Sequence, residues 1–91
     1  MSEIHLKRKH SLGLKNAKVA AQKVADDLQQ AYGMSSQWEG DVLRFTRSGV
    51  DGQLTVSKDE VTLNAKLGFL LSAFRHNIEG HINDNFDKYF V

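Results

Sequence analysis

The sequence contains neither cysteine nor proline among its 91 residues. Without cysteine, the chain has no disulfide framework, no thiolate nucleophile and no thiolate ligand for a metal. Without proline, its turns must depend on glycine, asparagine and aspartate. The formal net charge of +1 is also low, and by itself it indicates no polyanionic partner.

Long apolar runs are missing as well. No window approaches the ~18 apolar residues of a membrane span, and the basic N-terminus is not followed by the apolar run of a signal peptide. We therefore expect a cytoplasmic protein without a transmembrane segment. The apolar fraction of 41% and the charged fraction of 25% are ordinary for a globular protein. A chain of this length suffices for one modest core, so residues 1–91 are predicted to form a single α+β domain.

The first third of the chain predicts a short strand followed by a helix. Ile4 and Leu6 alternate with polar residues, which is typical of a strand with one buried face. Ser11 is a suitable N-cap, and Gly33 is a natural helix stop. Between them, apolar residues recur at three- and four-residue steps: Leu14, Ala17, Ala21, Val24, Leu28 and Ala31. Val19 falls off this stripe and is expected to be exposed.

Residues 36–65 predict an antiparallel meander of four strands. Turns at 40–41, 49–50 and 58–59 keep the same residues on one face and predict three cross-strand pairs: Trp38 with Leu43, Phe45 with Leu54, and Val56 with Val61. The predicted buried face consists of Trp38, Leu43, Phe45, Leu54, Val56, Val61, Leu63 and Ala65, joined by Ile4 and Leu6. The opposite face is polar and rich in threonine, as in a solvated antiparallel sheet.

The segment 65–86, AKLGFLLSAFRHNIEGHINDNF, predicts a long amphipathic helix that covers the apolar face of the sheet. Its stripe carries Leu67, Leu70, Leu71, Phe74, Ile78, Ile82 and Phe86, followed by Tyr89. Phe69 projects from the other side. The predicted order is β-α-β-β-β-β-α, an α+β fold with an antiparallel five-stranded sheet and both helices on one face. The same order occurs in the TBP-like, or helix-grip, architecture.

Two residues of this helix are candidates to touch a ligand. His81 and Asn85 lie four apart at the edge of the apolar stripe, where they could line a pocket between helix and sheet. Alternatively, both sit at the rim and form local hydrogen bonds. Trp38 and Phe74 either line the same pocket or fill it.

Other apolar residues fall outside the predicted core. We expect these to be available for contact with another protein, including a second copy in a homodimer. The set consists of Phe69, Val19, Val42 and Phe90, with Val91 at the C-terminus.

No motif for catalysis, metal binding or a cofactor stands out. His76 and His81 are five residues apart, whereas a helical zinc pair is spaced by four. The sequence also lacks a nucleophile elbow and a carboxylate pair in an apolar pocket. We therefore expect no enzyme activity, no catalytic residue, no metal and no cofactor. A small cyclase- or hydrolase-like enzyme remains an alternative, and it would need an empty cavity of at least ~300 Å³ under the last helix.

The basic run Lys7–His10, with Arg44, Arg47 and Lys66, could form a patch for nucleic acid. Three acidic residues share this region, and the outer face of the sheet offers no aromatic side chain for base stacking. Nucleic acid is therefore an unfavoured partner. A small nucleic-acid-binding or regulatory module that uses Lys7–His10 is kept as the second hypothesis.

Three stretches carry a family resemblance that covers nearly the whole chain. They are HSLGLKNAK after the first strand, WEGDVLRFTRSGVDGQLTV in the meander and AKLGFLLSAFRHNIEGHI in the last helix. In these stretches the chain resembles the polyhydroxyalkanoic acid system (granule-region) proteins. The resemblance implies a short cytoplasmic accessory protein of polyhydroxyalkanoate (PHA) storage, with the granule surface or granule proteins as partners, and it carries over no catalytic residue. The first hypothesis is thus a non-enzymatic binding protein that acts through apolar surface or a small helix–sheet pocket.

Overall fold

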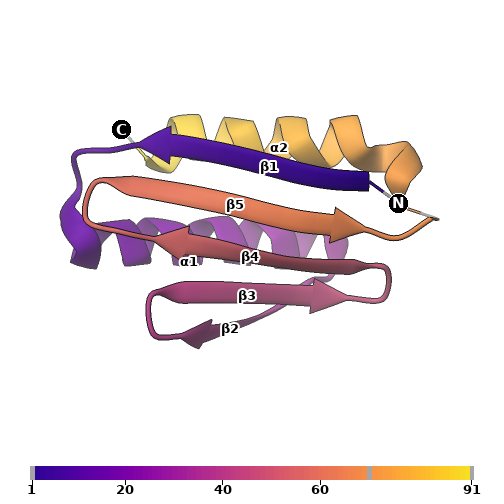
Figure 1. The fold of residues 1–91 in the computed structure, drawn as a ribbon, viewed down its shortest axis with the longest axis horizontal. Helices are drawn as coiled ribbons and strands as arrows, with labels where there is room; N and C mark the ends of the chain where they lie inside the picture. Colours follow the sequence, from indigo (N-terminus) through magenta and orange to yellow (C-terminus); the bar gives the residue numbers. More distant parts are fainter. Residues whose placement is uncertain (1, 70, 91) are drawn as a thin grey trace.

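Five strands form one antiparallel sheet, with two helices on one of its faces (Figure 1). The computed structural model describes residues 2–69 and 71–90. Its elements are β1 (Ser2–Lys9), α1 (Gly13–Tyr32), β2 (Ser35–Glu39), β3 (Val42–Arg47), β4 (Val50–Val56), β5 (Glu60–Leu67), a 3-10 turn (Ser72–Phe74) and α2 (Arg75–Tyr89). The predicted α+β fold, element order and five-stranded sheet are confirmed, whereas the helix-grip likeness stays a prediction.

The strand order is β1-β5-β4-β3-β2, so the first strand of the chain lies beside the last. Helix α1 carries the chain from β1 at one edge to β2 at the other. Its buried face is built mainly from small side chains, which allow the helix to lie close to the sheet: Ala17, Ala20, Ala21, Val24, Ala25 and Leu28. Gly33 ends the helix in the left-handed conformation, as predicted. The predicted N-cap is wrong, because Leu12 caps the helix without a side-chain hydrogen bond.

Each of the two helices covers a different part of the sheet. Helix α1 packs over β4, β3 and β2, and α2 packs along β1 and against α1 (Figure 1). The prediction that the last helix covers the meander is therefore wrong, since α1 does so. Side chains from both helices and the inner face of the sheet form one buried cluster that includes Leu43, Leu54, Leu63, Leu28, Ile82 and Phe86.

The cross-strand register agrees with the prediction at two of the three hairpins. Trp38 pairs with Leu43, and Val56 pairs with Val61. At the β3–β4 hairpin, however, Phe45 pairs with Gly52 rather than with Leu54. A shift of two residues leaves every side chain on its predicted face, because side chains alternate with a period of two. The predicted buried face is therefore correct although this register is wrong.

The ring of Phe45 explains why the strands pair in this register. A Cβ atom on Gly52 would lie 2.6 Å from Phe45 Cε2 and 3.1 Å from the Cβ of Ala65. Only glycine leaves room for the ring at this place on the inner face. The hairpin turn itself uses Gly49, whose φ of 88° is readily adopted by glycine.

The last helix begins at Arg75, whereas its apolar stripe was predicted to begin at Leu67. Strand β5 continues to Leu67, which pairs with both Ser2 of β1 and Val50 of β4. These residues therefore have their backbone groups engaged in the sheet and cannot start a helix. Gly68 follows, and its N–H donates to the carbonyl oxygen of Gly49 at 2.7 Å.

Because α2 begins late, half of the predicted apolar stripe lies outside the helix. Leu67 is buried on β5, and Leu71 is half-buried in the connection between β5 and α2. Phe74 was predicted in the core but is 50% exposed. Leu70 lies outside the described residues. Only the second half of the stripe, Ile78, Ile82 and Phe86, is buried on α2 as predicted, and Tyr89 packs at its edge.

Substitution of two glycines tests this packing. Gly52→Ala is expected to lower the free energy of unfolding by about 2 kcal/mol, because its methyl group would overlap the ring of Phe45. Gly80→Ala is the control, since a Cβ there has no neighbour within 4 Å and alanine favours the helix by up to about 1 kcal/mol. Urea denaturation measures both changes. A neutral Gly52→Ala would show that Phe45 does not lie over Gly52.

Candidate functional site

The four predicted pocket residues lie in three separate parts of the fold, since only His81 and Asn85 share one of them, helix α2. Trp38 lies at the β2 edge, where its Nε1 donates to Gln22 Oε1 at 2.8 Å. His81 lies half-buried between the two helices, with its ring 5.6 Å from that of Tyr32. Phe74 lies half-exposed before α2. The structure therefore does not bring these side chains together around one space.

Asn85 is the buried polar residue of the seam between the helices. It is 7% exposed, and its Nδ2 has no hydrogen-bond partner among the described residues. Along the same seam, Tyr89 donates to Asp27 Oδ2 at 3.3 Å, one helical turn beyond Asn85. A buried amide without a partner costs about 1–3 kcal/mol. We therefore expect Asn85 to weaken the packing of α2 against α1.

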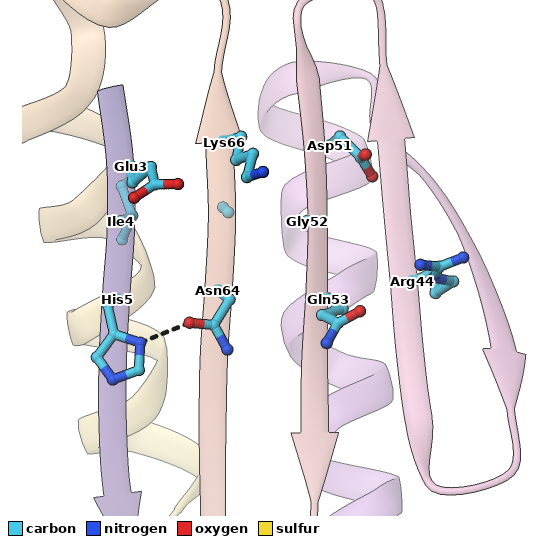
Figure 2. Close-up of a pocket in the computed structure, with 10 residues that line it drawn as sticks. Glu3, Ile4, His5, Arg44, Asp51, Gly52, Gln53, Asn64 and Lys66 are labelled. Atoms are coloured by element: carbon cyan, nitrogen blue, oxygen red, sulfur yellow. Dashed lines mark hydrogen bonds between the residues drawn. The ribbon is translucent and has the colours of Figure 1, made fainter. Parts of the chain in front are cut away.

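Two surface concavities lie outside the packed layer between helices and sheet. The larger, of about 510 Å³, lies on the open face of the sheet over β1, β5 and β4 (Figure 2). The smaller, of about 370 Å³, lies at the end of β1 beside His10 and Asp59. Neither lies under α2, where the enzyme alternative needs its cavity.

The larger concavity has a polar and charge-balanced lining. Glu3, Lys66 and Asp51 are neighbours across β1, β5 and β4, so that opposite charges alternate. In the next row, His5 Nδ1 lies 2.5 Å from Asn64 Oδ1 (Figure 2). Figure 2 shows these side chains spread over the strands without meeting at one point.

The basic run Lys7–His10 is divided between the two faces of β1. Lys7 lies on the open face and pairs with Glu60 at 3.4 Å. Arg8 points to α2, where it pairs with Asp87 and lies 6.0 Å from the centre of the Phe86 ring. These contacts occupy two of the charges that a nucleic-acid interface would need.

His10, predicted as the last residue of the basic run, is buried at the end of β1. Its Nδ1 accepts the backbone N–H of Leu12 at 3.1 Å, so its Nε2 carries the proton and donates to the carbonyl oxygen of Ser57 at 3.2 Å. Its ring also packs on Phe90, at 5.6 Å between centres. His10 therefore ties the start of α1 to the β4–β5 turn and to the end of the chain.

The residues predicted for protein contact differ in accessibility. Phe69 is 84% exposed and Val19 is 54% exposed, as expected of free apolar side chains. Val42 is half-buried on the open face of β3. Phe90 is buried against His10 and Phe86, so its side chain is not available at the surface. Val91 lies outside the described residues.

Phe69 belongs to the segment between β5 and α2, whose described residues, 68, 69 and 71–74, we call the apolar connection. Leu71 packs on Gly49, because its Cδ1 would lie 3.2 Å from a Cβ there. Leu71 and Ser72 both donate their backbone N–H to the carbonyl oxygen of Gly68, at 3.1 and 3.0 Å. The Ser72 hydroxyl donates to the carbonyl oxygen of Phe69 at 2.8 Å. The turn thus holds the rings of Phe69 and Phe74 at the surface.

These features define a small two-layer α+β protein with a packed core, a polar open sheet face and an exposed apolar connection. The chain belongs to the family described as putative polyhydroxyalkanoic acid system protein, whose family model matches residues 4–90. The resemblance found in the sequence is thereby confirmed. A comparison with curated proteins finds no significant match. Within the described residues, no helix is long and apolar enough to cross a membrane.

Asn85→Leu is expected to raise the free energy of unfolding by about 1 kcal/mol, because it removes an unpaired buried amide and keeps a similar volume. Asn77→Leu, at an exposed position of the same helix, is the control and should change stability by less than about 0.5 kcal/mol. Chemical denaturation measures both. A marked loss of stability in Asn85→Leu would mean that the amide has a partner.

His10→Ala is expected to lower the free energy of unfolding by about 3 kcal/mol, because it removes two buried hydrogen bonds and a ring contact with Phe90. His5→Ala, on the exposed face of the same strand, should cost less than about 0.5 kcal/mol. Thermal and urea unfolding at neutral pH compare the two variants. Equal effects would show that His10 does not tie these segments together.

Proposed function

We propose that this protein is a non-enzymatic accessory protein of PHA storage that works by binding through exposed apolar surface. The observation that carries the proposal is the apolar connection, in which Phe69 is 84% exposed and Phe74 is 50% exposed. Exposed aromatic rings are unfavourable in water, and exposed apolar surface commonly marks a contact. Membership of the polyhydroxyalkanoic acid system family supplies the biological setting.

The packing of the core favours surface binding over an internal pocket. Buried side chains from the inner sheet face and from α2 fill the layer where a helix–sheet pocket would lie: Leu43, Leu54, Leu63, Ile82 and Phe86. The residues proposed to line such a pocket are dispersed over β2, the helix seam and the apolar connection. Between the two binding modes left open by the sequence, we therefore choose the surface.

The same arrangement supports a role without catalysis. The polar side chains of the open sheet face are solvated, and they alternate in charge rather than converge. We place the protein in the cytoplasm, on or near the granule, as a monomer or a homodimer. The nucleic-acid alternative gains no support from Lys7 and Arg8, which are engaged by Glu60 and Asp87.

Co-sedimentation of the full chain with isolated native PHA granules tests this proposal. We expect the protein to pellet with granules in a saturable manner and to stay in solution without them. Binding through apolar surface should persist at high salt, which weakens contacts between exposed charges. A small globular protein of similar size, run in parallel, measures how much protein is trapped non-specifically in the granule pellet. A chain that stays in the supernatant at every granule concentration would refute the proposed function.

A further inference from the structure

We infer that the apolar connection binds the polyester phase of the granule directly, with the exposed ring of Phe69 entering the polymer surface. This inference rests on the proposed function and names its partner, an apolar polymer rather than a protein receptor. Three properties of the connection carry it: its position, its internal hydrogen bonds and the balance of charge around it.

The connection lies at one end of the molecule, where β5 ends and α2 begins (right-hand end of Figure 1). Aromatic side chains at an end of the molecule can reach a broad surface without a groove to receive them. The connection is also held in place from below, since Leu71 packs on Gly49 and Gly68 is hydrogen-bonded to the β3–β4 turn. A turn that is already ordered loses little conformational entropy when it binds.

Several polar groups among the described residues of the connection are paired with one another. The N–H groups of Leu71 and Ser72 share the Gly68 carbonyl oxygen, and the Phe74 N–H donates to the Leu71 carbonyl oxygen at 3.0 Å. The Phe69 carbonyl oxygen accepts the Ser72 hydroxyl. An apolar phase offers no partners to backbone groups, so a segment that enters it must satisfy them internally. Recognition by strand addition would instead need free backbone donors and acceptors.

Charges close to the connection are compensated. Lys66 lies between Glu3 and Asp51 in the sheet. Arg75, the first residue of α2, lies 3.7 Å from Glu79 and donates to the Glu3 carbonyl oxygen at 3.2 Å. This end of the molecule therefore presents no excess charge to attract an anionic surface. The attraction must come from the apolar rings, and it should depend little on salt.

Binding of the full chain to protein-free particles of amorphous polyhydroxybutyrate tests the inference. We compare the wild type with Phe69→Ser and, as a matched control, Val19→Ser, which removes an exposed apolar side chain from α1. Phe69→Ser should weaken binding about 30-fold, as expected when one buried phenylalanine ring is lost. Val19→Ser should bind as the wild type does, and high salt should change binding less than about twofold. Unfolding curves should be unchanged in both variants, since both positions are exposed.

The possible outcomes distinguish a failure of the proposed partner, the polymer, from a failure of the proposed function. Binding to native granules but not to protein-free particles would overturn the inference and leave the proposed function standing, with a granule protein as the partner. Equal binding by Phe69→Ser and the wild type would overturn the apolar connection as the site. Equal or tighter binding to anionic phospholipid vesicles would overturn the polymer as the partner, and a dimer that dissociates in Phe69→Ser would assign the surface to a second copy. Failure to bind either granules or particles would end both proposals.

Discussion

Strand β5 pairs with β1 on one side and with β4 on the other, from Val61 through Leu67. This double pairing holds the first strand of the chain in the sheet and keeps the backbone extended up to Gly68. The chain then meets the β3–β4 turn, where Gly68 and Gly49 lie in contact. Helix α2 can form only beyond this point, so residues 68–74 become a connection. The exposure of Phe69 and Phe74 is thus a consequence of sheet pairing.

The rest of the fold is held by contacts that join distant segments at the two ends of β1. Near its start, Arg75 of α2 donates to the Glu3 carbonyl oxygen, and near its end Arg8 reaches Asp87 while His10 bonds to the β4–β5 turn. By contrast, the seam between the helices contains Asn85, whose Nδ2 has no hydrogen-bond partner among the described residues. The contact of Arg75 with Glu3 lies directly after the apolar connection and ties that end of it to β1.

Much of the sheet could be predicted from the sequence, because the alternation of apolar residues decides which face each side chain takes. The alternation cannot detect a shift of two residues, and this is why the pairing of Phe45 with Gly52 was missed. The prediction of a helix in the segment 65–74 was wrong for a different reason. Leu67, Leu71 and Phe74 have helical spacing, although they lie in a strand, a turn and a 3-10 turn. Only the pairing partners of β5, which are distant in sequence, decide between these structures.

The candidate site was predictable in part. Phe69 was expected to be exposed because it falls off the apolar stripe, and this holds even though the helix begins later. Phe74 was missed because its place in the core depended on that helix. The burial of His10 could not be predicted, since it depends on the turn at Ser57 and on Phe90, both far along the chain.

Direct contact between the apolar connection and the polymer is the central functional claim. Replacement of Phe69 by a benzophenone amino acid, followed by irradiation on native granules, tests it most directly because the probe reports what lies against that side chain. We predict that the protein becomes covalently attached to polyester chains, whereas the same probe at Val19 yields no such product. Attachment to a granule protein, or equal labelling of polymer from both positions, would contradict the claim.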